Sequence, residues 1–166
     1  MTAPPQPAFS IRPARPGDED ALFGLIQALA EYEKLSHAVT GSAEKLAHDL
    51  FGAQPAAEAL VAEAALRPVA FALFFRSYST FLTQPGLYLE DLFVLPEFRR
   101  CGIGKALLSE LAKVARARRS GRLEWSVLDW NASAISFYQS LGASILPDWR
   151  ICRVTGDGLQ TLAELR

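Results

Sequence analysis

The sequence predicts one α/β domain, with a mixed sheet that carries helices on both faces. The 166 residues fit the length of a single domain, and half of them are apolar, enough to bury a full core. Strand and helix patterns alternate along the chain. The strongest strand, residues 87–95, is apolar apart from two adjacent acids, and a glycine turn and an amphipathic helix follow it.

The first half of the chain predicts two helices between a short strand and a hairpin. Residues 1–7 hold three prolines and are expected to form a flexible tail. Asp18 and Ser42 are of the type that caps helix N-termini, and each precedes apolar residues at helical spacing. Arg67 and Pro68 mark the hairpin turn. The expected elements are a strand around Phe9 and Ile11, helices from 19 to about 35 and from 43 to 50, and strands 60–64 and 69–78.

The second half predicts a strand, a helix, a further strand, a further helix and a structured tail. Pro96 ends the strand, and the next helix buries a stripe that includes Ile103, Leu107 and Leu111. Gly142 is typical of the position just after a helix. The expected elements are strand 87–95, a helix after residue 102, strand 122–128, helix 132–141, one or two strands within 145–154 and a short helix over 159–165.

Composition excludes several classes of protein. A net charge of −1 argues against a general nucleic-acid binder. The two cysteines, Cys101 and Cys152, form no disulfide framework or zinc pattern, and His37 and His48 lack companions at metal-ligand or triad spacing, so no metal is expected. The N-terminus has no signal-peptide pattern, and no apolar run approaches about 18 residues. These features predict a soluble cytoplasmic protein without membrane partners.

The turn after strand 87–95 is a candidate phosphate site. Arg99, Gly102 and Gly104 follow a buried strand and open a helix, where backbone N–H groups and the helix dipole favour an anion. The structural alternative is a tight turn that needs glycine. The alternative dinucleotide-binding motif GxGxxG does not match, because Leu107 occupies the position of its third glycine. Glu124 does lie at about the distance along the chain where that motif has the acid that binds the ribose.

Glu90 and Asp91 interrupt the apolar strand. On a regular strand adjacent side chains point to opposite faces, so one acid could face a cleft. The other could form a structural ion pair, because buried acids are costly without partners. A regular strand does not decide which acid faces the cleft, and a bulge near Leu92 would re-aim both.

Tyr138 and Asn131 belong to the helix over 132–141. Spacing alone favours Tyr138 as a core residue between Ile135 and Leu141. Asn131 alone would be a helix cap.

These residues together resemble the GNAT superfamily of acetyl-CoA-dependent N-acetyltransferases. The phosphate motif R/Q-x-x-G-x-G/A of that superfamily matches Arg99, Gly102 and Gly104. Over nearly the whole chain, the segments IRPA, LAEYEKL, YLEDLFVLPEFR, GIG, LDWN, FY and LGA resemble the diamine (spermidine/spermine) N-acetyltransferases. LAEYEKLS, Tyr78-Ser79-Thr80 and VLDWN are most similar to the thialysine Nε-acetyltransferase branch.

The resemblance implies one GNAT domain over residues 1–166, with a mostly antiparallel central sheet that splays open between two strands around acetyl-CoA. It also implies a homodimer and direct attack of a primary amine on the thioester in a ternary complex. Tyr138 would be the general acid, which displaces its core interpretation, and Glu90 the base. The cofactor contacts would be Leu92, Phe93, Val94, Arg99, Arg100, Cys101, Gly102, Ile103, Gly104, Lys105 and Asn131, and the acceptor contacts Tyr32, Glu33, Glu90, Asp91 and Glu124.

The acceptor implied by the resemblance is a thialysine- or lysine-like amine or a small di- or polyamine. Segment 36–39 lacks the extra acids of the polyamine enzymes, and loop 79–86 contains none, which favours a shorter amine. The segment before Trp149 is shorter than in the family, and Asp148 is the candidate stand-in for a family acid there. A non-catalytic acyl-CoA sensor on the same fold and a nucleotide-binding oxidoreductase are the alternatives.

Overall fold

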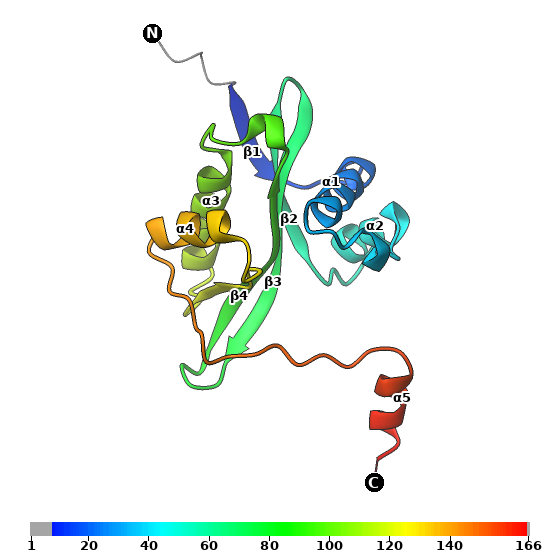
Figure 1. Ribbon diagram of the computed structural model, residues 1–166. Coiled ribbons are helices and arrows are strands. Elements are labelled where there is room, and N and C mark those ends of the chain that lie inside the picture. The colour runs from blue at the N-terminus through cyan, green and yellow to red at the C-terminus, as the bar shows by residue number, and fades with distance from the viewer. Residues whose placement is uncertain (1–7, 166) are drawn as a thin grey trace. The chain divides into compact units, whose positions relative to one another are not determined.

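The computed structural model describes residues 8–165, so the expected flexible tail at residues 1–7 lies outside the described residues. Contacts divide the chain into two compact units, Met1–Ser126 and Val127–Arg166. The first unit contains the sheet and the second contains the two C-terminal helices, as Figure 1 shows by label and colour.

The first unit is built on a five-stranded sheet in the order β1-β2-β3-β4-β5. Strands β1 to β4 pair as antiparallel neighbours, and β5 runs parallel to β4. The sheet is therefore mixed and mostly antiparallel, which confirms the predicted fold class. The strands are β1 (Phe9–Pro13), β2 (Glu58–Ala64), β3 (Arg67–Ser79), β4 (Gln84–Val94) and β5 (Leu123–Trp125).

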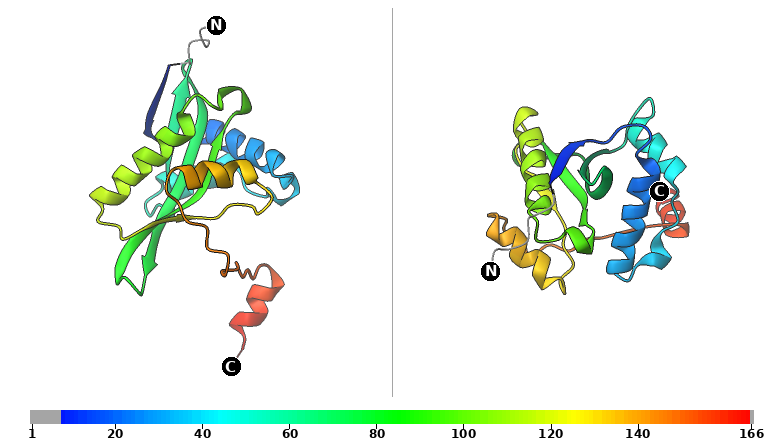
Figure 2. Two further views of the ribbon diagram at one scale, coloured as in Figure 1. Left: turned by 60° about the vertical axis from the view of Figure 1, so that its left-hand side comes forward. Right: turned by 90° about the horizontal axis from the view of Figure 1, so that it is seen from above.

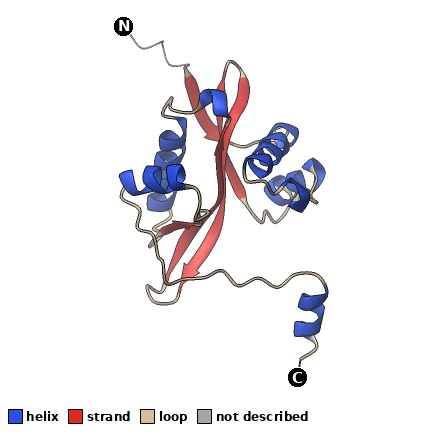
Figure 3. Ribbon diagram, viewed as in Figure 1, coloured by secondary structure: helices blue, strands red, loops and turns tan. Residues whose placement is uncertain are grey.

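Helices cover both faces of this sheet, as Figures 2 and 3 show. Helices α1 (Glu19–Tyr32) and α2 (Ala43–Phe51) lie on one face, and α3 (Ile103–Ala117) lies on the other. Because both faces are covered, the middle of β3 is a continuous apolar run instead of an alternating one. Two short 3₁₀ helices, η1 (Ser36–Ala38) and η2 (Pro96–Phe98), lie in the connections. The core on the α1 side includes Leu22, Leu25, Leu29, Val61, Phe71 and Phe93.

Asp18 occupies the predicted N-cap position of α1, but its side chain does not cap the helix. Its carboxylate instead accepts two hydrogen bonds from the Arg12 guanidinium, at 2.6 and 2.8 Å, and one from the Arg15 N–H at 2.8 Å. Arg12 also donates to Glu63 at 2.6 Å. The bonds from Arg12 lower the pKa of Asp18, and the partly buried network ties the start of α1 to the edge of the sheet.

Helix α1 ends at Tyr32, about three residues before its predicted end. Lys34 adopts a left-handed conformation with φ of 61°, and the Leu35 N–H donates to the Ala30 carbonyl at 2.7 Å. This arrangement satisfies carbonyls of the last turn and prevents the helix from continuing.

The hairpin turn between β2 and β3 lies at Ala65 and Leu66, so the predicted turn at Arg67-Pro68 is wrong by two residues. Ala65 and Leu66 have φ of 50° and 61°, the left-handed values that match the twist of two antiparallel strands. Pro68 is tolerated at the start of β3 because the pairing register shifts there, opposite Glu63.

The sheet opens between β4 and β5. Their parallel pairing runs only from Leu87↔Leu123 to Leu89↔Trp125, whereas β4 continues to Val94. β5 is therefore shorter than the predicted strand 122–128. The edge of β4 beyond Leu89 is left unpaired by β5, which is the splay that the resemblance implied.

The second unit contains α4 (Ala132–Ser140) and α5 (Asp157–Ala163), close to the predicted helices. Asn131 caps α4 by accepting from the Ala134 N–H at 3.2 Å, and Gly142 has the left-handed φ of 90° expected after a helix. The strands predicted within 145–154 are wrong: the segment has no regular structure. Trp149 and Ile151 are 76% and 71% exposed. A strand needs a neighbouring edge, and among the described residues none pairs with this segment.

No helix within residues 8–165 combines the length and the apolar character needed to cross a membrane.

Candidate active site

A β-bulge places the two acids of β4. Leu73 pairs with Asp91 and Phe74 pairs with Leu89, so Glu90 is the extra residue of β4. The bulge at Glu90 lies two residues before Leu92, the position near which a bulge was considered from the sequence. Glu90 is exposed and Asp91 is half-buried. The extra residue interrupts the alternation of side chains, so the two acids cannot be assigned to opposite faces by strand periodicity.

Asp91 is close enough to two other carboxylates, Glu90 and Glu33, to feel their charges. Burial, and after it the charges of Glu90 and Glu33, raise the pKa of Asp91 to about 6. Glu33 follows the last residue of α1, and burial raises its pKa as well. Within residues 8–165 no ion pair joins any of these acids to a lysine or arginine, so the structural ion pair considered from the sequence is not formed. A cationic ligand would relieve the repulsion among them.

The turn into α3 has the backbone of an anion site. Arg100 and Gly102 have φ of 63° and 83°, and a Cβ on Gly102 would meet nothing within 4 Å. The helix has no side-chain cap at Gly102 and no acid in its first turn. The first hydrogen bond of the helix runs from the Ala106 N–H to the Gly102 carbonyl at 3.0 Å. The N–H groups of residues 103–105 therefore have no partner within the helix and can bind an anion.

The side chains around this turn differ in what they can reach. Arg100 and Lys105 are exposed, whereas Ile103 is 1% exposed and belongs to the core. Ile103 can therefore contact a ligand only through its backbone. Cys101 is half-buried, and its thiol donates to the Arg99 carbonyl at 3.5 Å. Gly104 lies in the first turn of α3.

Arg99 differs from the other basic residues of the turn because its guanidinium contacts the protein. It lies over the ring of Tyr32 at 4.6 Å and over the ring of Phe93 at 5.5 Å, measured to the ring centroids. Its Nε donates to the Val94 carbonyl at 3.0 Å. Arg99 thus connects the end of α1 to the end of β4.

The remaining predicted residues are spread over the two units. Leu92 and Val94 are half-buried on the part of β4 that β5 leaves unpaired. Glu124 lies on β5 opposite Tyr88, and its carboxylate binds Arg122 Nε at 2.6 Å. Tyr138 is 8% exposed in α4, with its ring 5.3 Å from that of Phe137. Contacts of the first unit thus bring together the three acids, Tyr32 and Arg99, whereas Tyr138 and Asn131 belong to the second unit.

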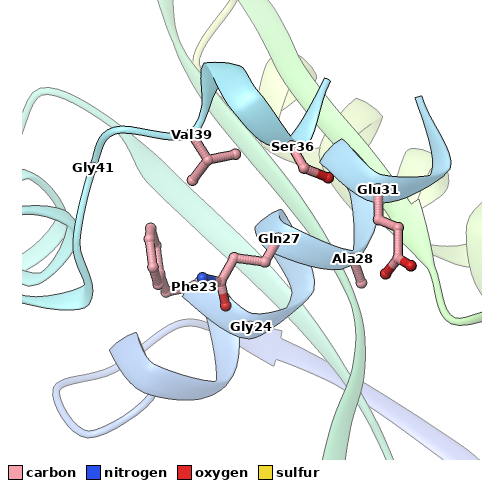
Figure 4. A pocket seen from close by; sticks show the side chains of 8 residues that line it. All are labelled: Phe23, Gly24, Gln27, Ala28, Glu31, Ser36, Val39 and Gly41. Atoms are coloured by element: carbon pink, nitrogen blue, oxygen red, sulfur yellow. The ribbon is translucent and has the colours of Figure 1, made fainter. Parts of the chain in front are cut away.

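A pocket of about 460 Å³, which the sequence did not predict, lies between α1 and the connection to α2, as Figure 4 shows. Gln27 and Glu31 line it one helical turn apart, which is the only sequence signal that could have suggested it. The lining residues are Phe23, Gly24, Gln27, Ala28, Glu31, Ser36, Val39 and Gly41.

Tyr88 and Ser126 were also not predicted from the sequence. Their hydroxyl groups form a 2.7 Å hydrogen bond between β4 and the residue after β5. The bond holds the two strands together next to the point where the sheet opens.

Comparisons with known proteins agree with this geometry. The chain is 40% identical over 164 residues to a thialysine N-epsilon-acetyltransferase of Bos taurus, with 92% of this chain and 96% of the relative covered. It is 32% identical over 200 residues to an L-ornithine N5-acetyltransferase of Arabidopsis thaliana, covering 93% and 88%.

Solved structures have the same fold. An integron cassette protein from the mobile metagenome of V. cholerae superposes with a TM-score of 0.79 at 26% identity, covering 95% of this chain and 98% of that one. A ribosomal-protein-alanine N-acetyltransferase from Brucella melitensis, at 21% identity and a TM-score of 0.70, covers 90% and 99% and supports the fold alone. Residues 25–143 match the family described as the acetyltransferase (GNAT) family. Because that match spans most of the chain, this protein belongs to the acetyltransferase (GNAT) family.

Proposed function

We propose that this protein transfers the acetyl group of acetyl-CoA to a primary amine by direct attack in a ternary complex. The observation that carries the proposal is the combination on one strand–turn–helix unit of unpaired carboxylates and an anion-binding turn. The carboxylates of β4 suit a protonated amine as acceptor, and the turn into α3 suits the pyrophosphate of the acetyl donor.

The residues of the turn fit acetyl-CoA. The amides at the start of α3, with the side chains of Arg100 and Lys105, suit the pyrophosphate. The edge of β4 that β5 leaves unpaired offers backbone hydrogen bonds at Leu92, Phe93 and Val94 to the pantetheine amides. When bound, acetyl-CoA supplies the thioester that the amine attacks. The proposed contacts also include Cys101, Gly102, Ile103, Gly104 and Asn131.

The protein groups have proton-transfer roles in this reaction. A primary amine has a pKa of about 10.4 and arrives protonated at neutral pH, so it must lose a proton before attack. Glu90 is the proposed base, acting through water. Asp91, whose pKa of about 6 leaves it ionised at neutral pH, is a second group able to accept the proton. A backbone N–H of β4 would stabilise the oxyanion, and Tyr138 would protonate the departing thiolate.

We propose that the acceptor is a short amine with a lysine- or ornithine-like side chain, or a small diamine. Two of the relatives are named for amino-acid side-chain amines, thialysine and L-ornithine. Glu33 and Asp91 would bind the ammonium group, with Tyr32 and Glu124 as further contacts. Loop 79–86 contains no acid, so a long polycation would find few partners there.

A thiol-release assay over thialysine, lysine, ornithine, putrescine and spermidine tests the proposed function. We expect acetyl-CoA-dependent turnover that is fastest with one of the amino acids that carry a side-chain amine, namely thialysine, lysine or ornithine. Tight acetyl-CoA binding without turnover of any amine would instead favour the acyl-CoA sensor. Turnover that is fastest with spermidine would contradict the proposed acceptor class while leaving amine acetylation in place.

We further propose that the protein acts as a homodimer in the cytoplasm, without a nucleic-acid or membrane partner. Both cysteines are free thiols, which suits a reducing compartment. Segment 145–154 has the alternating apolar pattern of a strand at Trp149 and Ile151, but within residues 8–165 no strand pairs with it. A second copy of the chain could supply that edge.

A further inference from the structure

We propose that Arg99 is a positioning residue that holds the end of α1 against the end of β4 and so sets the acceptor side of the active site. The inference rests on the proposed function and deepens it. The motif match made Arg99 a phosphate contact. Its own contacts instead assign it to acceptor recognition, and they leave the pyrophosphate to Arg100, Lys105 and the helix amides.

The guanidinium of Arg99 contacts two aromatic rings and one backbone carbonyl. The cation lies 4.6 Å from the centroid of Tyr32 and 5.5 Å from that of Phe93, and Nε donates to the Val94 carbonyl at 3.0 Å. Arginine can stack and donate in this way at the same time because its guanidinium is planar. Lysine can keep the charge near a ring but has no Nε–H in that position.

The partners of Arg99 are the chain neighbours of the carboxylates. Tyr32 is the last residue of α1, and Glu33 follows it directly. Phe93 and Val94 follow Asp91 on β4. The charge of Glu33 disfavours ionisation of Asp91 and contributes to its raised pKa. Arg99 forms no ion pair with either acid among the described residues, so it acts by holding their segments and not by neutralising them.

The end of α1 needs such a contact. Tyr32 is 40% exposed, and after Glu33 the chain turns away through Lys34 with its left-handed φ of 61°. Two hydrogen bonds to α1 hold this turn, from the Lys34 N–H to the Glu31 carbonyl at 3.0 Å and from the Leu35 N–H to the Ala30 carbonyl at 2.7 Å. The stack of Arg99 on Tyr32 joins this turn to β4.

Arg67 provides a matched control. Its guanidinium lies 5.3 Å from the centroid of Phe98, in the same β4–α3 connection, and it pairs with Glu97 at 3.5 Å. Arg67 and Glu97 are exposed at the surface, and among the described residues no ion pair or cation–π contact joins either of them to α1, Asp91 or Glu33. Both arginines therefore make a cation–π contact, but only Arg99 links α1 to β4.

Steady-state kinetics of the full-length variants test the inference. Arg99→Ala should raise the KM for the amine, or lower kcat/KM for it, roughly tenfold, the effect of losing one cation–π contact and one hydrogen bond. The dissociation constant for acetyl-CoA should stay within about twofold. Arg99→Lys should recover part of the loss, and Arg67→Ala should resemble the wild type. Arg100→Ala should show the opposite pattern, with weakened acetyl-CoA binding and little change in the amine KM.

Hydrogen exchange supplies a readout that does not depend on catalysis. The amides of Lys34 and Leu35 should exchange faster in Arg99→Ala than in the wild type or in Arg67→Ala, because the turn they close is then released. A wild type without turnover would contradict the proposed function alone, and faster exchange in Arg99→Ala would still support the positioning role. A double-mutant cycle of Arg99→Ala with Tyr32→Ala should be non-additive.

Two results would overturn the inference. One is weakened acetyl-CoA binding in Arg99→Ala with an unchanged amine KM, since that is the behaviour of a phosphate ligand. The other is unchanged exchange of the Lys34 and Leu35 amides with additive kinetic effects of Arg99→Ala and Tyr32→Ala. Arg99→Lys serves all these measurements if the alanine variant fails to fold.

Discussion

Asp91 carries a half-buried carboxyl group that the fold makes costly to ionise. Burial and then the charges of Glu90 and Glu33 raise its pKa to about 6, above the roughly 3.9 of an unfolded aspartate. The folded protein therefore holds a proton more tightly than the unfolded chain. Stability falls as the pH rises from about 4 to about 6, and the full cost remains at neutral pH.

Replacement of Asp91 by asparagine should therefore stabilise the protein at neutral pH. We expect a gain of about 1–3 kcal/mol in the free energy of unfolding near pH 7.5, with little gain near pH 4, where the aspartate is already protonated. Urea unfolding at the two pH values measures this difference. A loss of acetyl transfer should accompany the gain in stability. Equal stability of variant and wild type near pH 7.5 would contradict the raised pKa.

Asp18 is the matched control with the opposite sign. Hydrogen bonds from Arg12 lower its pKa, so its contribution to stability is present above the unfolded pKa and is lost as the pH falls through the folded one. Asp18→Asn should destabilise the protein at neutral pH by about 1–3 kcal/mol, and the difference should shrink in acid. The same urea titrations give this value.

Tyr138 is the residue whose role most depends on the family pattern. Tyr138→Phe keeps the buried ring of α4 and removes only the hydroxyl group. If that group protonates the departing thiolate, kcat should fall by about 10²-fold or more while acetyl-CoA affinity changes little. Single-turnover rates and equilibrium binding separate the two effects. An unchanged kcat would remove Tyr138 from the mechanism and restore its interpretation as a core residue.

At the scale of elements, the start of α3 depends on the backbone of Gly102. Its φ of 83° lies in the left-handed region, where a side chain costs about 1–2 kcal/mol even though the space around it is open. Gly102→Ala should destabilise the protein by about that amount. It should also weaken acetyl-CoA binding by displacing the helix amides. Thermal unfolding and calorimetric titration measure the two effects.

Gly24 is the control for this substitution. It lies inside α1, also with open space around its Cβ position, but its φ is not positive. Alanine there should stabilise the helix by about 0.5–1 kcal/mol and leave acetyl-CoA binding unchanged. Destabilisation by both variants, or by neither, would mean that the left-handed conformation is not what makes Gly102 necessary.

At the scale of the whole molecule, segment 145–154 has the pattern of a strand, but no strand among the described residues pairs with it. Trp149 and Ile151 are 76% and 71% exposed, so polar substitution there does not disturb a core. If this segment pairs with a second copy, Trp149→Glu combined with Ile151→Glu should convert a dimer to monomers. Leu66→Glu, at the fully exposed hairpin turn, should not. Light scattering over a range of concentrations gives the outcome, and a variant that remains dimeric would place the interface elsewhere.

Local interactions explain how much of this fold was predictable. Ser42, Asn131 and Gly142 were identified as helix boundaries because caps act within one turn of the chain. The hairpin turn lies two residues before the Arg67-Pro68 position that the sequence predicts, because the twist of the paired strands selects two left-handed residues, Ala65 and Leu66. Segment 145–154 was predicted as strand because its pattern is that of a strand, but pairing is not a local property.

The sequence by itself determined the mixed sheet, the helices, the glycine turn into α3 and membership of the acetyltransferase family, since each depends on residues close together in the chain or on a motif. Only the tertiary structure decided how the two acids of β4 differ. The bulge at Glu90 and the approach of Glu33 from α1 depend on pairing and packing between distant segments. The same is true of Arg99. Its motif indicates a phosphate contact, and the contact of its guanidinium with the ring of Tyr32, at the end of another helix, depends on packing between distant segments.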